Sequence, residues 1–262
     1  MKNSSLLDTI LTRTSVREFD SQRKVSKEAT RQILHAGINA PSAGNIQPRT
    51  FIVVENKSAK EQLYELCENQ VYMKHAPLWI VVCADLHRHL KAAKLTGVKY
   101  EYHGALPFTF SVLDAALSLE NMVIAAETLG LGSVIIGSVI EHPEQVKQIL
   151  KLPRHCLALS VLCIGHPKKK PSRREKWSYD IIVCKNEYRD VNIDDVLEYW
   201  KRFILSDLKR FGKEASMAMV EKLLEEGKQG SYGTTYANHY KEEFIKNTSR
   251  KLMEFLKSQG FL

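Results

Sequence analysis

The sequence predicts an α/β or α+β sandwich, in which helices pack on a central sheet of buried strands. Two observations carry this prediction. Short, continuous apolar runs recur along the first 165 residues, as is typical of strands buried on both faces. Stretches with the apolar spacing of helices separate these runs.

The segment 112–140 combines both features and forms the expected centre of the fold. Its first part, 112–129, is predicted to be a helix whose apolar residues fall on every side, and such a helix is buried on every side. Gly130 suits the end of this helix, and 133–136 is predicted to be a buried strand that ends at Gly137. A chain of this length has little reason to bury a helix so completely by itself, so we expect a second subunit to pack against it.

The remaining elements follow from the same periodicities, and the chain becomes mostly helical after residue 192. The expected strands are 50–54, 78–84, 133–136 and 157–164. The other expected helices are 3–12, 26–38, 59–68, 85–95, 142–150, 196–211, 214–226 and 237–259. Residues 96–110 fit no regular period and are predicted to be a mobile insert, and 227–235 a flexible break.

The composition is that of an ordinary soluble globular protein, with 262 residues, 44% hydrophobic and 26% charged. No run reaches 18 apolar residues, because Asp114, Glu120 and Glu127 interrupt the long helix, so no membrane span is predicted. The N-terminus lacks the apolar region of an export signal. The five cysteines form no CxxC pair, and we expect buried, reduced thiols in a cytoplasmic protein.

The net charge of +8 raises the hypothesis of nucleic-acid binding. Much of the excess lies in one basic segment, 168–176, and no helix-turn-helix, zinc-finger or RRM pattern accompanies it. A solvated loop or a phosphate-binding loop is therefore favoured, and no nucleic-acid partner is predicted. His87 and His89 do not share a helical face and no HExxH exists, so no metal site is predicted either.

The segment Arg13-Thr14-Ser15-Val16-Arg17 is a candidate anion site. In an extended conformation Arg13, Ser15 and Arg17 point the same way. Two guanidinium groups and a hydroxyl on one face suit a phosphate. A surface loop with ordinary arginines is the alternative.

The loop 39–48 is rich in proline and amide side chains. Such a loop could bind the edge of a heterocycle, although a plain connector explains its composition equally well. The Gly130-Leu131-Gly132 stretch fails as a dinucleotide fingerprint, because a helix and not a strand precedes it. GxxxxGK[ST] and GxSxG motifs do not occur.

Five motifs in one order resemble the FMN-dependent nitroreductases. They are 13–17 (RTSVR), 41–48 (PSAGNIQP), 69–70 (NQ), 113–137 (LDAALSLENMVIAAETLGLGSVIIG) and 164–167 (IGHP) followed by a basic loop. The C-terminal residues FLKSQGF are similar to those of the larger, NADPH-preferring branch. The resemblance covers essentially the whole chain.

The resemblance implies an α+β fold, a three-layer α/β/α sandwich with a central mixed sheet, in an intertwined homodimer. It implies that 1–190 form the FMN-binding domain. Residues 191–262 would form a helical extension that embraces the partner subunit. Two FMN molecules would lie in the subunit interface.

The resemblance also assigns the site residues. Those at the FMN phosphate and ribityl chain are Arg13, Thr14, Ser15 and Arg17, with Arg174 and Lys176 as a late basic pair. Those of the flavin-contacting loop, supplied by the partner subunit, are Ser42, Ala43 and Asn45. Those at the ribityl chain or along the isoalloxazine are Gln70, Ile135, Ile136, Gly137 and Ser138.

Three positions depart from the family pattern. Thr14 stands where a second arginine or histidine is frequent, and Ser138 stands where glycine is frequent. The loop that would hold the 2′-phosphate of NADPH offers only Lys228, so the choice between NADPH and NADH stays open.

The implied activity is the reduction of nitroaromatics, quinones or free flavins by NAD(P)H through a ping-pong hydride transfer. The flavin carries the chemistry, so no side chain is assigned as a catalytic acid or base. The alternatives are a flavin-binding redox sensor with low turnover and a basic interaction protein that keeps the fold.

Overall fold

The computed structural model describes residues 5–99, 104–169, 171–210, 216–225 and 242–262. The chain divides into two compact units. The larger unit comprises Met1–Pro171 and Thr248–Leu262, and the smaller comprises Ser172–Asn247. The division expected at residue 190, with a C-terminal extension on the partner, stays a prediction.

The larger unit is built on a four-stranded sheet with the order β1-β2-β4-β3. Its strands are β1 (Arg49–Val53), β2 (Leu78–Asp85), β3 (Gly132–Ile136) and β4 (Cys156–Gly165). All neighbouring strands are antiparallel, so the expected mixed sheet is wrong for the described strands. The Val54 amide, just after β1, donates to the Trp79 carbonyl at the start of β2 over 3.0 Å. The chain therefore leaves β1 and enters β2 at the same end of the sheet. Parallel pairing among the described residues is limited to an isolated bridge between Ser15 and Ser133.

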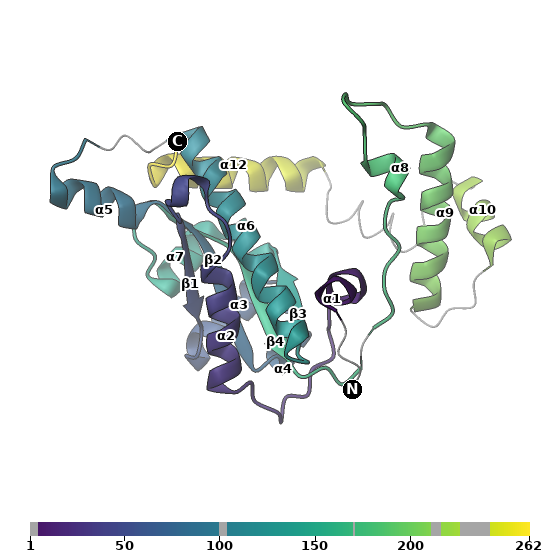
Figure 1. Cartoon of the computed structure of the whole chain (residues 1–262), viewed down its shortest axis with the longest axis horizontal. Helices are drawn as coiled ribbons and strands as arrows, with labels where there is room; N and C mark the ends of the chain where they lie inside the picture. Colours follow the sequence, from purple (N-terminus) through teal and green to yellow (C-terminus); the bar gives the residue numbers. More distant parts are fainter. Residues whose placement is uncertain (1–4, 100–103, 170, 211–215, 226–241) are drawn as a thin grey trace. The chain divides into compact units, whose positions relative to one another are not determined.

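Helices cover both faces of this sheet and make the three-layer sandwich expected from the sequence (Figure 1). Leu78, Ile80 and Val82 of β2 pack with α2 (Lys27–Ile38) and α6 (Ala105–Thr128). The alternate residues of β2, from Trp79 to Cys83, pack with α3 (Lys57–Leu66) and α7 (Pro143–Leu150). Successive side chains of a strand point to opposite faces, so a strand that is apolar from Leu78 to Ala84 contributes to both layers of the core.

Polar caps set where several helices begin. Ser5 and Asp8 form a capping box at the start of α1 (Leu6–Thr12). The Ser26 hydroxyl accepts from the Ala29 amide at the start of α2. Asn56 caps α3 in the same way.

Helix α6 differs from expectation at its start and on one face. It begins at Ala105, so the predicted insert 96–110 is wrong for its last six residues. Phe108 packs against Phe261 with ring centroids 5.1 Å apart, and the Gly104 amide donates to the Phe261 carbonyl over 2.9 Å. These contacts join residues far apart in sequence, and no local period reveals them.

Burial of α6 on every side is also wrong within one chain. Ala115, Met122 and Ala126 lie in the core, whereas Leu113 and Leu117 are 53% and 45% exposed. Among the described residues, α6 alone is long and apolar enough to cross a membrane by length and composition, a property that core helices of soluble proteins share.

The C-terminal residues complete a third apolar cluster in the larger unit. Helix α12 (Glu242–Ser258) contributes Phe255 and Leu256, which with Phe261 surround Leu86 and Leu157. Helix α5 (His87–Thr96) begins directly after Leu86. The predicted break 227–235, with Lys228, lies outside the described residues.

Helices joined by irregular segments make up the described part of the smaller unit. It contains α8 (Tyr179–Ile182), α9 (Ile193–Arg210) and α10 (Met217–Glu225). Ile204, Leu208 and Val220 form its apolar cluster. Trp177 stacks on Tyr199 with ring centroids 3.6 Å apart.

All five cysteines are free thiols, and four of them, all except Cys184, are buried. The prediction of buried, reduced thiols is confirmed for these four. Burial raises the pKa of the Cys67 thiol to about 12 and also raises that of Cys163.

Candidate functional site

The arginine segment lies against the edge strand β3. The Val16 amide donates to the Ser133 carbonyl over 2.9 Å, which makes the segment a short parallel neighbour of β3. Thr14 and Val16 point into the protein and are buried, whereas Arg17 on the opposite face is exposed. The alternation predicted for residues 13–17 is therefore present.

Gly132 makes this close approach possible. A Cβ atom at this position would lie 2.5 Å from Cγ2 of Val16 and 2.9 Å from its Cβ, closer than carbon atoms can approach. Because glycine has no such atom, the arginine segment can lie directly on the strand.

The same segment continues beside the end of β4. The Asp20 amide donates to the His166 carbonyl, and the Lys168 amide donates to the Glu18 carbonyl, both over 2.8 Å. The start of the basic loop therefore lies beside the residues that follow Arg17. The positive charges of Arg17 and of the basic loop, gathered at this edge of the sheet, favour an anionic ligand.

A hydrogen-bonded chain links this edge to the end of β3. The Tyr72 hydroxyl donates to Oε1 of Gln70, and Nε2 of Gln70 donates to the Ser138 hydroxyl over 3.0 Å. The Arg17 guanidinium lies over the Tyr72 ring, 5.5 Å from its centroid. Three residues predicted separately, Arg17, Gln70 and Ser138, are thereby brought together.

The four residues predicted to lie along the isoalloxazine divide into two pairs. Ile135 is 42% exposed, and Gly137 has open space where a Cβ would point. Ile136 and Ser138 are buried, so the side chain of Ile136 belongs to the core. Exposed backbone and one apolar side chain leave a surface on which a flat ring could lie.

The predicted flavin-contacting loop is held by helix α6. Asp114 accepts from the Ser42 hydroxyl and from the Ala43 amide, the latter over 3.2 Å. Residues Ala43–Asn45 form a single 3-10 turn, η1, in which Asn45 is exposed with a left-handed φ of 56°.

Arg174 and Lys176 belong to the smaller unit. There the Arg174 guanidinium lies 3.6 Å from the Asp207 carboxylate, which is largely buried. Their convergence with Arg13 and Arg17 on one phosphate stays a prediction.

A buried polar atom of Arg13 favours a phosphorylated ligand at the arginine segment. Among the described residues, Nε of Arg13 and Oγ1 of Thr14 are buried without a hydrogen-bond partner. Buried polar atoms are normally satisfied. The segment thus offers an unsatisfied charged donor, Nε of Arg13, where the resemblance puts the FMN phosphate, and this residue fits that group. Thr14 points into the protein, away from Arg17, so its contact with the phosphate stays a prediction.

The sequence did not reveal the roles of two residues. Tyr72 orients Gln70 and contacts Arg17, yet only its position two residues after Gln70 could have drawn attention to it. In the sequence, Asp114 stands out only as an interruption of an apolar helix. A carboxylate inside such a helix is itself a signal, because a buried charge requires partners.

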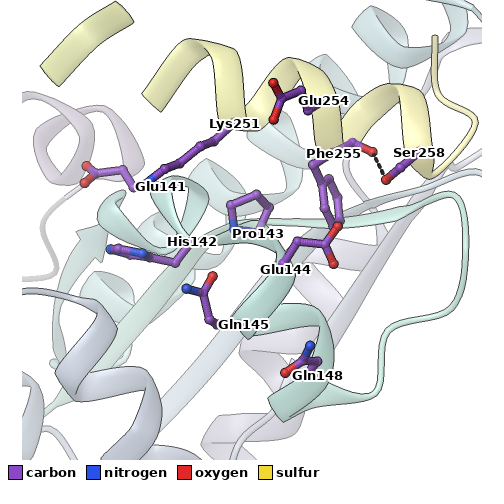
Figure 2. Close-up of a pocket in the computed structure, with 10 residues that line it drawn as sticks. All are labelled: Glu141, His142, Pro143, Glu144, Gln145, Gln148, Lys251, Glu254, Phe255 and Ser258. Atoms are coloured by element: carbon purple, nitrogen blue, oxygen red, sulfur yellow. Dashed lines mark hydrogen bonds between the residues drawn. The ribbon is translucent and has the colours of Figure 1, made fainter. Parts of the chain in front are cut away.

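A separate open groove of about 540 Å³ lies between α7 and α12 (Figure 2). His142, Lys251 and Phe255 are among its lining residues, and none of the predicted flavin residues is. Burial lowers the pKa of His142, the nearby Lys251 ammonium lowers it further, and Glu68 opposes both. Within the described part of the chain, no cluster of three or more His, Cys, Asp or Glu residues could hold a metal ion.

The sandwich and its basic strand edge define an α+β protein with a candidate site for a phosphorylated cofactor. The chain belongs to the nitroreductase family, whose pattern matches residues 10–166.

Individual relatives and solved structures agree with this assignment. The chain is 28% identical to the NADPH-flavin oxidoreductase of Vibrio harveyi over 196 residues, 75% of this chain and 80% of the relative. It is 31% identical to the FMN reductase (NADPH) of Bacillus subtilis over 194 residues, 73% and 77% of the two chains. The structure of a hypothetical oxidoreductase from Bacillus subtilis superposes with a TM-score of 0.82 at 26% identity, covering 98% of this chain and 97% of the other.

Proposed function

We propose that the protein is an FMN-dependent NAD(P)H oxidoreductase that reduces nitroaromatics, quinones or free flavins. Family membership and relatives named as NADPH-flavin oxidoreductase and FMN reductase support this class of activity. The observation that carries the proposal is the joining of Arg17, Gln70 and Ser138 through Tyr72 at the end of β3.

The residues of this chain would bind and orient the cofactor. Arg13 and Arg17 would neutralise the phosphate, and the hydroxyl of Ser15, on the same face of the segment, would donate to its oxygens. Gln70 would contact the ribityl chain or the ring. When bound, FMN would supply the two-electron redox chemistry between NAD(P)H and the acceptor.

The segment around β3 would receive the ring. Ile135 offers an apolar contact, and the open space at Gly137 leaves the backbone accessible. Fixed backbone dipoles and nearby positive charge stabilise negative charge that develops on a bound ring. Such stabilisation requires no side-chain acid or base.

The functional unit would be a homodimer. Helix α6 exposes Leu113 and Leu117, and α1 exposes Leu6, Leu7 and Ile10. The two helices pack against each other, so these leucines and isoleucine lie on adjoining elements. Exposed apolar side chains gathered on neighbouring helices favour a subunit interface, with Ser42, Ala43 and Asn45 supplied to the partner's flavin.

The dimer has a direct test. Light scattering during gel filtration should give twice the chain mass of 29.9 kDa. A paired Leu113→Glu and Leu117→Glu variant should run as a monomer and lose FMN. A monomeric wild-type protein that retains FMN would contradict the shared site.

We further propose a cytoplasmic location, because reduced thiols and a nicotinamide reductant both suit that compartment.

Anaerobic spectroscopy tests the activity. The purified protein should be yellow, should bleach on addition of NADPH or NADH, and should regain its colour when a nitroaromatic or quinone is added. Double-reciprocal plots should be parallel, as ping-pong kinetics require. Yellow protein that does not bleach would instead indicate a redox sensor, and protein that cannot be loaded with FMN would refute the proposal.

A further inference from the structure

Asp114 is a buried carboxylate whose two oxygens both serve one loop. Its residue is 2% exposed, on the core face of α6. Oδ2 accepts from the Ser42 hydroxyl and Oδ1 accepts from the Ala43 amide. Hydrogen bonds to a buried charge are stronger than neutral ones, so this carboxylate fixes the loop firmly.

The Ser42 hydroxyl is itself occupied by the protein. It donates to Asp114 and accepts from the Gln47 amide over 2.7 Å. Its single hydrogen is therefore committed, and no donor remains for a ligand. Ser42 therefore connects the start of the turn both to the Asp114 carboxylate and to Gln47 at the end of the turn.

Arg49 supplies the charge that balances Asp114. Its Nη1 lies 3.7 Å from Oδ2 of Asp114, and the side chains are 4% and 3% exposed. The guanidinium donates to three backbone carbonyls just before the turn, over 2.8 to 3.1 Å: those of Ile38, Ala40 and Pro41. Burial lowers the pKa of Arg49, and Asp114 opposes this shift.

The loop needs such a clamp because its backbone is unfavourable. Gly44, Asn45 and Gln47 all have φ values of 56° or 57°, in the left-handed region. For a residue with a side chain this region costs about 1 kcal/mol or more. A loop with two such residues keeps its shape only when neighbouring groups enforce it.

We propose that Asp114 is the positioning residue of the flavin-contacting loop, and that Ser42 acts by holding this loop in shape and not by donating to the flavin. The inference rests on the proposed function. Asp114 does not touch the cofactor; it fixes the Ser42–Ala43 backbone and thereby the exposed Asn45. The same carboxylate offsets the charge of Arg49, which donates to the Ile38 carbonyl at the end of α2. The position of the loop is therefore fixed relative to the end of α2.

A double-mutant cycle separates positioning from direct contact. The variants are Asp114→Asn, Ser42→Ala and the double variant, each stripped of FMN and titrated with FMN by fluorescence quenching. If Ser42 acts through Asp114, each single variant should lower FMN affinity by roughly tenfold to hundredfold, and the double variant should be little worse than either. Additive losses would mean that Ser42 contacts the flavin independently and would overturn the proposal.

Ser118→Ala is the matched control. Ser118 is also buried on the core face of α6, one turn after Asp114, and its hydroxyl bonds only within the helix to the Asp114 carbonyl over 2.9 Å. This variant should keep the FMN affinity of the wild type. Ser42→Thr, which retains a hydroxyl in an extended backbone, should restore most of the affinity that Ser42→Ala loses.

A second measurement does not depend on the folding of Asp114→Asn. Amide exchange in FMN-free protein should be faster at Ala43 and Gln47 in Ser42→Ala than in the wild type, because the loop loses its tie. Unchanged exchange together with weakened FMN binding would assign Ser42 to direct contact. Failure of the wild type to bind FMN would refute the proposed function, whereas normal FMN binding by Asp114→Asn would refute this inference alone.

Discussion

The amide of Val16 donates to the carbonyl oxygen of Ser133 over 2.9 Å, and this bond ties the arginine segment to the edge of the sheet. Position 132 directly precedes the acceptor and has no room for a Cβ atom. The geometry of the proposed phosphate site therefore depends on the absence of a side chain at Gly132.

Gly132→Ala should displace Val16 and with it the arginines. Overpacking of this kind costs about 1–3 kcal/mol of folding free energy, and FMN affinity should fall by roughly tenfold. Thermal unfolding and FMN titration measure the two effects. The Val16→Ala change removes the closest contact, which is to Cγ2, but leaves the Cβ of residue 16 only 2.9 Å from the new Cβ, so the double variant should recover part of the affinity. No recovery would show that the segment does not depend on this contact.

Tyr72→Phe should loosen the Gln70 amide. The lost hydroxyl holds Oε1 of Gln70, so the amide becomes free to turn away from Ser138. A hydrogen bond of this kind contributes about 0.5–1.5 kcal/mol, and FMN should dissociate several times more readily. Tyr188→Phe, at a tyrosine that is 84% exposed, is the control. Equal FMN affinity in both variants would show that the Tyr72 hydroxyl does not contribute to FMN binding.

His142 should make stability depend on pH. Its pKa is lowered in the folded protein, mainly by burial and further by Lys251 (Figure 2). The unfolded chain therefore takes up a proton near its ordinary pKa of 6.5, before the folded chain does, and the free energy of unfolding falls as the pH drops through that value. His142→Gln should show a smaller loss between about pH 7.5 and 5.5. Parallel pH curves for the two proteins would contradict this account.

The thiols should differ sharply in reactivity. The neutral, buried thiols of Cys67 and Cys163 have raised pKa values, and thiolates are the reactive form. A disulfide reagent at neutral pH should label only Cys184 in the native protein and all five cysteines in denaturant. Rapid labelling of Cys67 in the native protein would be inconsistent with its burial.

Local patterns predicted the elements of the larger unit well. Uniformly apolar runs located β2 and β4, and apolar residues at helical spacing located α2. They could not give strand direction, because an apolar run carries no information about its neighbour. The first turns of α6 could not be predicted from local patterns, because the contact that supports them joins Phe108 to Phe261.

In the candidate site, too, local features could be predicted from the sequence and long-range contacts could not. Alternation along residues 13–17 is a local property, and the structure has it. The ties made by Ser42 and Gln70 cross 72 and 68 residues of sequence, to Asp114 and Ser138. Such links depend on the tertiary fold, so residue types alone could not reveal them.

The central claim is that Arg13 and Arg17 bind the phosphate of a flavin lying along β3. Calorimetric titration of flavin-free protein with FMN and with riboflavin, which lacks the phosphate, tests it most directly. Charge-assisted hydrogen bonds contribute about 1.5–3 kcal/mol each, so the wild type should prefer FMN by roughly a hundredfold or more. The Arg13→Gln/Arg17→Gln variant should bind the two flavins within about tenfold of each other. An unchanged preference for FMN in that variant would contradict the account.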